Sequence, residues 1–213
     1  MKISEVYRKF SITPNLQEHM LTVTKVALFI ADHWIGPELN KDRLKKAALV
    51  HDLGNIVKFD FVAHPEFLGD EQKRVGYWKK KQREIIEKYG DDDHEATKLM
   101  LNELGFDNDS IEVISSKSFA NSIATKDSNN WSLKILLYSD LRVLPSGVGT
   151  LEERLKDILE RMLQYNTRPD LENLFEACRD IERQIQANVT IPLSEINSKS
   201  IEKTHSDLLN ENI

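Results

Sequence analysis

Apolar residues recur at helical spacing along most of this chain. Between Thr13 and Pro37 they fall three or four positions apart, at Leu16, Met20, Val23, Ala27, Ile30 and Trp34. Side chains at this spacing share one face of a helix, and such an apolar face packs against a core. Thr13-Pro14 is a start signal, because threonine caps a helix and proline suits its first position. Gly36-Pro37 ends the pattern, which predicts one long core-facing helix.

The rest of the chain also reads as helices. They are predicted over residues 40–52, 71–89, 93–105, 109–114 and 131–144, then from the capping box Thr150–Glu153 and again after Pro169. Residues 55–70 show no sustained period, which indicates a long loop of the kind that often covers a functional site. Residues 125–130 read as a polar loop. No alternation of apolar and polar residues persists, so the sequence predicts an all-α fold.

Composition and charge narrow the class of protein. The 213 residues are 40% hydrophobic and 30% charged, which is ordinary for one well-cored globular domain. The formal charge of −6 argues against a nucleic-acid coat and against an electrostatic membrane binder. A phosphorylated substrate is not excluded, because a bound metal can reverse the field locally.

The expected compartment is the reducing cytoplasm. The single cysteine, Cys178, cannot form an internal disulfide, and its place on an apolar stripe predicts an inert buried thiol. No apolar run approaches the ~20 residues of a membrane span. The first residues lack the apolar core of a signal peptide.

Candidate chemistry centres on the stretch from Ala47 to Gly54, which reads AALVHDLG. An apolar helical run ends there in adjacent polar residues, His51 and Asp52. Burying both is costly unless something pairs with them. A divalent metal suits both residue types, whereas a surface or supporting pair is the plain alternative.

Two further helices carry polar residues among apolar neighbours. His19 lies at the edge of the first stripe, and Asp140 lies in the middle of an almost wholly apolar helix. An ion pair with Arg142 or with a lysine on another helix would also explain Asp140. Two imidazoles and two carboxylates together would neutralise a divalent cation and leave coordination positions open for water and substrate. We therefore predict that His19, His51, Asp52 and Asp140 bind one metal.

These motifs resemble the HD-domain superfamily of metal-dependent phosphohydrolases. The resemblance rests on the order of His19, the His51-Asp52 pair and Asp140, with the local sequences LQEH, ALVHDLG and SDLR, and covers roughly residues 13–165. It implies that these four residues are the metal ligands and that the metal is Mn, Mg, Co, Ni, Fe or Zn. It predicts one HD-type helical domain over residues 1–192, with a polar tail over residues 193–213.

The resemblance also implies an activity. The expected reaction is hydrolysis of a nucleotide or another small phosphoester by a metal-activated water. The alternative is a non-catalytic module of the same fold that senses a nucleotide and signals to a partner. No membrane partner is expected and a nucleic-acid partner is disfavoured, while the sequence leaves the choice between monomer and homodimer open.

His94 resembles a further histidine found in binuclear members of the superfamily. Those members also carry histidines on the next helix, where this chain reads SSKSFAN over residues 115–121. The difference favours one metal. His94 is then predicted to deliver a proton to the leaving oxygen or to contact a phosphate.

Residues near the predicted ligands are candidates for substrate contacts. Asn55 and Lys58 follow the His51-Asp52 pair, and Lys58, Lys117 and Arg142 could bind phosphate. Asp60 lies at an offset from Asp52 where some nucleotidases of the superfamily orient the attacking water. For each, a plain surface role is the alternative. The basic run over residues 79–83 reads as a solvated helix face, with a phosphate-facing patch as the alternative.

Overall fold

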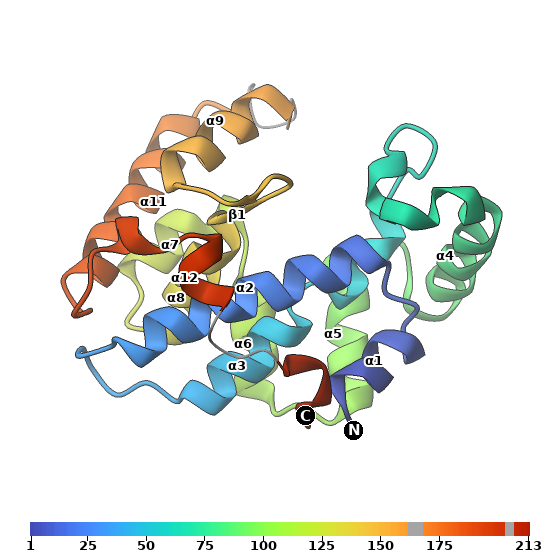
Figure 1. Ribbon diagram of the computed structural model, residues 1–213, viewed down its shortest axis with the longest axis horizontal. Coiled ribbons are helices and arrows are strands. Elements are labelled where there is room, and N and C mark those ends of the chain that lie inside the picture. Colours follow the sequence, from blue (N-terminus) through green and yellow to red (C-terminus); the bar gives the residue numbers. More distant parts are fainter. Residues whose placement is uncertain (162–167, 203–206) are drawn as a thin grey trace. The chain divides into compact units, whose positions relative to one another are not determined.

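The computed structural model describes residues 1–161, 168–202 and 207–213. They are predominantly helical, as Figure 1 shows. Within these ranges, paired β structure is limited to one short hairpin and isolated bridges, so the predicted all-α fold is confirmed. The chain divides into two compact units. Unit 1 comprises residues 1–21, 49–115 and 207–213, and unit 2 comprises residues 22–48 and 116–206.

Unit 1 is built from α-helices joined by 3₁₀ segments, which are labelled η. Its elements are α1 (Ile3–Lys9), the start of α2 (Pro14–Asp32), η1 (Leu53–Lys58), η2 (Pro65–Arg74), α4 (Val75–Tyr89), α5 (Asp93–Leu104), α6 (Asn108–Ser116) and η5 (Leu208–Asn210). Helix α5 packs on both η1 and α4. Fully buried side chains from these elements, among them Leu53, Ile56, Met100 and Leu101, form its core.

Unit 2 is organised around α11, which packs on α7, α8 and α9. Its elements are the rest of α2, α3 (Lys41–Val50), η3 (Phe119–Asn121), α7 (Ser122–Asp127), α8 (Trp131–Leu141), β1 (Val143–Leu144), β2 (Gly147–Val148), α9 (Leu151–Arg161), α11 (Leu171–Gln186), η4 (Leu193–Glu195) and α12 (Ser198–Glu202). Cys178 of α11 lies against Ser122, and burial raises the pKa of its thiol to about 11.

The segment predicted as a loop over residues 55–70 is mostly 3₁₀ helix. Backbone bonds from Asn55 N–H to the Asp52 carbonyl and from Phe59 N–H to the Ile56 carbonyl close three-residue turns. Side chains three apart are stacked in a 3₁₀ helix, so short pieces leave no amphipathic pattern to detect. The following α-helix accordingly begins at Val75 and not at residue 71.

The helix predicted over residues 131–144 ends early. Helix α8 stops at Leu141, and Val143 and Leu144 pair with Val148 and Gly147 in an antiparallel hairpin. Proline at position 145 restricts Leu144 to extended conformations, and Gly147 adopts a φ of 113° that favours glycine. Short helices α1 and α7, the second covering part of the predicted loop 125–130, were also missed.

Near the C-terminus, the chain buries apolar side chains. Leu193, Ile196, Ile201 and Leu208 are each at most 4% exposed. The predicted boundary between a domain and a tail at residue 192 stays a prediction. No helix in the described part of the chain combines the length and apolar character needed to cross a membrane.

One glycine fixes how η1 meets α5. Gly54 donates its N–H to the Thr97 hydroxyl at 2.9 Å, and that hydroxyl donates to the Asp93 carbonyl. A Cβ at position 54 would lie 2.7 Å from the Thr97 backbone nitrogen. The first turn of α5 can therefore approach the residues after Asp52 only because position 54 has no side chain.

We expect Gly54→Ala to destabilise the protein by about 1–3 kcal/mol, because the added methyl group forces η1 and α5 apart. Gly76→Ala is the matched control, since a Cβ there meets nothing within 4 Å. Thermal unfolding of the two variants should show a lower Tm for the first and no loss for the second. Equal Tm values would contradict this account of the contact.

Candidate metal centre

His51 and Asp52 lie where α3 turns into η1. Helix α3 ends at Val50 and η1 begins at Leu53, so the two polar residues occupy the turn between them. His51 is only 3% exposed. Tyr7 from α1 donates its hydroxyl to the Leu49 carbonyl at 2.8 Å and so holds the end of α3 in place. The turn is thus fixed from both sides, by α1 and by α5.

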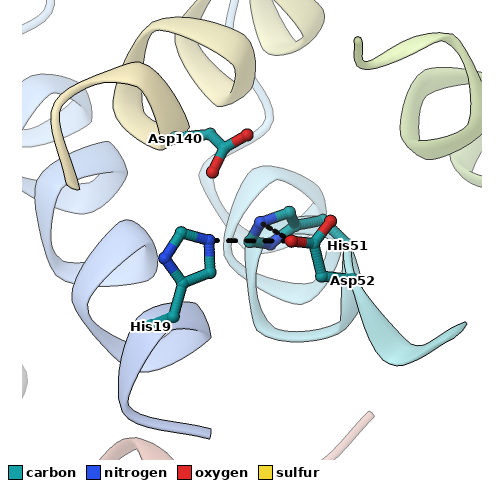
Figure 2. A group of neighbouring side chains, drawn as sticks. All are labelled: His19, His51, Asp52 and Asp140. Carbon is teal, nitrogen blue, oxygen red and sulfur yellow. Dashed lines mark ion pairs between the residues drawn. The ribbon is translucent and has the colours of Figure 1, made fainter. Parts of the chain in front are cut away.

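His19 from α2 approaches the carboxylate of Asp52. Its Nε2 lies 3.6 Å from Asp52 Oδ2, and His51 Nε2 lies 3.5 Å from that same oxygen. The two imidazole rings are 5.4 Å apart between centroids (Figure 2). Two ligands that each lie ~2.1 Å from one ion are roughly 3.0–3.5 Å apart, close to these separations.

Asp140 from α8 belongs to the same group. His19, His51, Asp52 and Asp140 each offer one ligand atom, and these four atoms all lie within 4.8 Å of one another. Two imidazoles and two carboxylates are an ordinary donor set for a divalent transition metal. The chemistry of the residues present therefore fits the predicted ion.

Asp140 is also paired with a lysine. Lys117, which follows α6, places its ammonium 2.9 Å from Asp140 Oδ2, and its side chain is 9% exposed. The ion pair left open by the sequence thus exists, with Lys117 as the partner. A carboxylate has two oxygens, so this pair and metal ligation do not exclude each other. The predicted contact of Lys117 with phosphate stays a prediction.

Arg142 lies in a buried network two residues after Asp140. Its guanidinium donates to the carbonyls of Leu193 and Ile196 at 3.1 and 2.8 Å, and to the Tyr138 hydroxyl at 2.6 Å. Its Nε–H donates to the Gly149 carbonyl. These bonds tie the hairpin and the segment after Pro192 to the end of α8. The predicted phosphate contact of Arg142 is not tested by these bonds.

The remaining predicted residues lie outside the group of four. Asn55 is half-buried in η1, and Lys58 at its end forms an ion pair with Asp93. Asp60 Oδ1 accepts the N–H groups of Val62 and Ala63, and these bonds lower the pKa of its carboxyl. His94 is exposed in the first turn of α5. Their catalytic and substrate-binding roles stay predictions.

Three residues that support the site went unnoticed in the sequence. Thr97 anchors Gly54, Tyr7 holds the end of α3, and Gln82 of α4 donates to the carbonyls of Ile56 and Phe59. Each acts through a hydrogen bond to backbone of a segment far along the chain. Such bonds leave no periodic pattern, so the sequence carries no signal for them.

A scan against protein families gives one match. The family model described as HD domain matches residues 16–129, more than half of the chain. The chain belongs to the HD-domain family. HD domains bind divalent metals and are generally hydrolases, and His19, His51 and Asp52 lie inside the matched range. Asp140 lies beyond it, so its place in the HD metal centre rests on the geometry. No curated protein and no solved structure matches the chain.

We expect Lys117→Met to raise the affinity of the HD domain for a divalent ion, because it removes a positive charge beside Asp140. Without metal the variant should be destabilised by up to about 3 kcal/mol, as expected when a mostly buried ion pair loses its cation. Calorimetric titration with Mn²⁺ and thermal unfolding with and without Mn²⁺ measure both effects.

Lys134→Met is the matched control, because Lys134 is an equally buried lysine whose ammonium donates to the neutral Gln184. Its affinity for Mn²⁺ should equal that of the unmodified chain. A lower affinity in Lys117→Met would contradict the expectation and would mean that Lys117 holds Asp140 in position for the ion.

Proposed function

We propose that this HD domain is a metal-dependent phosphohydrolase that acts on a nucleotide or another small phosphoester. One observation carries the proposal: two imidazoles and two carboxylates, separated by up to 121 positions along the chain (from His19 to Asp140), converge to within 4.8 Å. Membership of the HD-domain family supports the same conclusion.

The donor set points to one divalent transition metal. Imidazole nitrogen suits Mn, Fe, Co, Ni and Zn better than it suits Mg, which prefers oxygen ligands. His19 and His51 would supply the nitrogens, and Asp52 and Asp140 would supply carboxylate oxygens. The two carboxylate charges would balance the charge of the ion, which makes a buried cation tolerable.

When bound, a divalent ion lowers the pKa of a coordinated water and polarises a phosphoryl oxygen. The folded chain determines from which side a phosphate can reach the metal site. His51 is closed off from solvent, but the side chains of His19 and Asp52 are 26% and 13% exposed. A phosphate could therefore approach from the side of His19 and Asp52, while His51 lies behind.

We assign proton delivery and substrate contacts to residues of α5 and η1. His94 lies in the first turn of α5, the helix that packs on η1 directly after Asp52, and it would donate a proton to the leaving oxygen. Asn55 and Lys58, both in η1, would contact the substrate, with the ammonium of Lys58 facing its phosphate.

One observation favours a second function. Lys117 already supplies a positive charge to Asp140. An HD domain whose fourth ligand is balanced by lysine could bind a nucleotide without hydrolysing it, and would then act as a sensor. Both functions use the same residues and differ only in turnover.

The decisive experiment combines elemental analysis with an activity panel. We expect about one divalent metal per chain, and turnover of at least one compound among phosphomonoesters, phosphodiesters and nucleotides. Asp52→Ala should lose the metal and lower the rate by about 100-fold or more, because outright removal of a ligand costs at least as much as removal of a supporting residue.

Asp42→Ala is the matched control, because Asp42 is an exposed aspartate on α3, the helix that leads to Asp52, and pairs with Lys45 and Lys46. It should keep both metal and activity. Metal binding without turnover anywhere on the panel would favour the sensor. A chain that binds no divalent metal would overturn the phosphohydrolase.

A further inference from the structure

Unit 1 contains a pocket to which none of the four candidate metal ligands contributes. It has a volume of about 320 Å³ and lies between one face of α4 and the segment that ends η1. Its lining residues are Val57, Lys58, Phe59, Asp60, Phe61, Lys79, Gln82, Arg83 and Ile86. This volume is at the lower end of the range for small-molecule sites.

The walls of the pocket are fixed before any ligand binds. Lys79, Gln82, Arg83 and Ile86 follow the spacing of one helix face. The Gln82 amide donates to the Ile56 and Phe59 carbonyls at 2.8 and 2.7 Å, which holds the opposite wall against α4. On that wall, the Phe59 ring stacks on Phe67 with centroids 4.4 Å apart. A preformed pocket loses little conformational entropy when a ligand binds.

The basic run of α4 divides into two faces with different partners. Lys80 and Lys81 are not among the lining residues, and both form ion pairs with Glu84, at 4.0 and 2.7 Å. Lys79 and Arg83 line the pocket, and no carboxylate of the described residues lies within 4 Å of either charge. They are also one helical turn apart, where like charges repel each other. A ligand anion between them would remove this repulsion.

Asp60 gives the pocket an acceptor beside these cations. Its Oδ1 accepts two backbone N–H groups, and its carboxyl is exposed. The N–H groups of Ala63 and Val62, and to a lesser extent the charges of His64 and Lys79, lower the pKa of the Asp60 carboxyl, so Asp60 stays ionised. An ionised carboxylate accepts hydrogen bonds strongly from hydroxyl groups. The lining thus offers a phosphate two cations that form no ion pair within the described part of the chain, and it offers a hydroxyl one acceptor.

We propose that this pocket binds a phosphorylated sugar, either free or as part of a nucleotide, and that it does so without the metal. Lys79 and Arg83 bind the phosphate, Asp60 accepts a sugar hydroxyl, and Phe59 and Ile86 cover the apolar side of the ligand. The site therefore adds a metal-independent binding function to the HD domain.

Binding is tested on the full chain in the presence of a chelator, with ribose 5-phosphate and AMP as probes and ribose and adenosine as controls that lack phosphate. Calorimetry gives Kd, and amide shifts in NMR spectra locate the site. We expect binding of at least one phosphorylated probe, with shifts around residues 57–61 and 79–86, and no binding of the controls. Tighter binding of AMP than of ribose 5-phosphate would assign the pocket to nucleotides, and the reverse would assign it to free sugar phosphates.

The matched pair of variants is Lys79→Gln/Arg83→Gln against Lys80→Gln/Lys81→Gln. Both remove two charges from the same helix, but only the first changes the pocket. We expect Kd to rise about tenfold or more in the first and less than about twofold in the second, because charge-assisted bonds to phosphate are lost only there. Asp52→Ala should bind the probes as the unmodified chain does, which separates this site from the metal centre.

Several results would overturn the proposal. Equal losses in the two double variants would show that only the net charge of α4 attracts anions. Shifts confined to His19, His51 and Asp52, or loss of binding in Asp52→Ala, would place the ligand at the metal centre. Binding of a single-stranded RNA through Lys79 and Arg83, with no binding of either small probe, would assign this face to nucleic acid. None of these results depends on whether the protein hydrolyses a phosphoester.

Discussion

A carboxylate oxygen shared by two imidazoles is the constraint on which the candidate site depends. His19 and His51 both place Nε2 within 3.6 Å of Oδ2 of Asp52. This arrangement costs solvation free energy, because it partly buries three polar side chains next to one another. The surrounding structure nevertheless maintains it, through the Tyr7 bond to the end of α3 and the contact of Gly54 with α5. Local packing thus holds the ligands in a geometry that a metal ion would stabilise.

The sequence predicted the parts of this structure that depend on periodicity and on polar residues within apolar stripes. The long helix from Pro14, the capping box at Thr150 and the group of four candidate ligands could all be read in this way. The 3₁₀ segments could not, because their period of three carries no amphipathic stripe. The hairpin after α8 is two residues per strand, too short for alternation to show. The pairing of Lys117 with Asp140 depends on tertiary contact and has no local signal.

Composition alone does not show which cations of the basic run over residues 79–83 form ion pairs and which line a pocket. In the sequence its cations are equivalent, and a solvated face and a phosphate-facing patch both explain them. In the folded chain Glu84 balances Lys80 and Lys81, whereas Lys79 and Arg83 line a pocket. Helical geometry, which separates adjacent residues by about 100°, produces this difference. The solvated face therefore describes the side of Lys80 and Lys81, and the phosphate-facing patch stays a prediction for the side of Lys79 and Arg83.

The bonds of Arg142 bear on where this protein can be shortened. Its guanidinium joins the end of α8 to backbone carbonyls more than fifty positions further along, at Leu193 and Ile196. An excised fragment cut at residue 129, where the family match stops, would lack Asp140 altogether. A fragment cut at residue 192 would keep Asp140 but remove two of the acceptors that satisfy a buried guanidinium, and unsatisfied buried charge is poorly tolerated. A fragment that keeps all the acceptors of the Arg142 guanidinium therefore extends at least to Ile196.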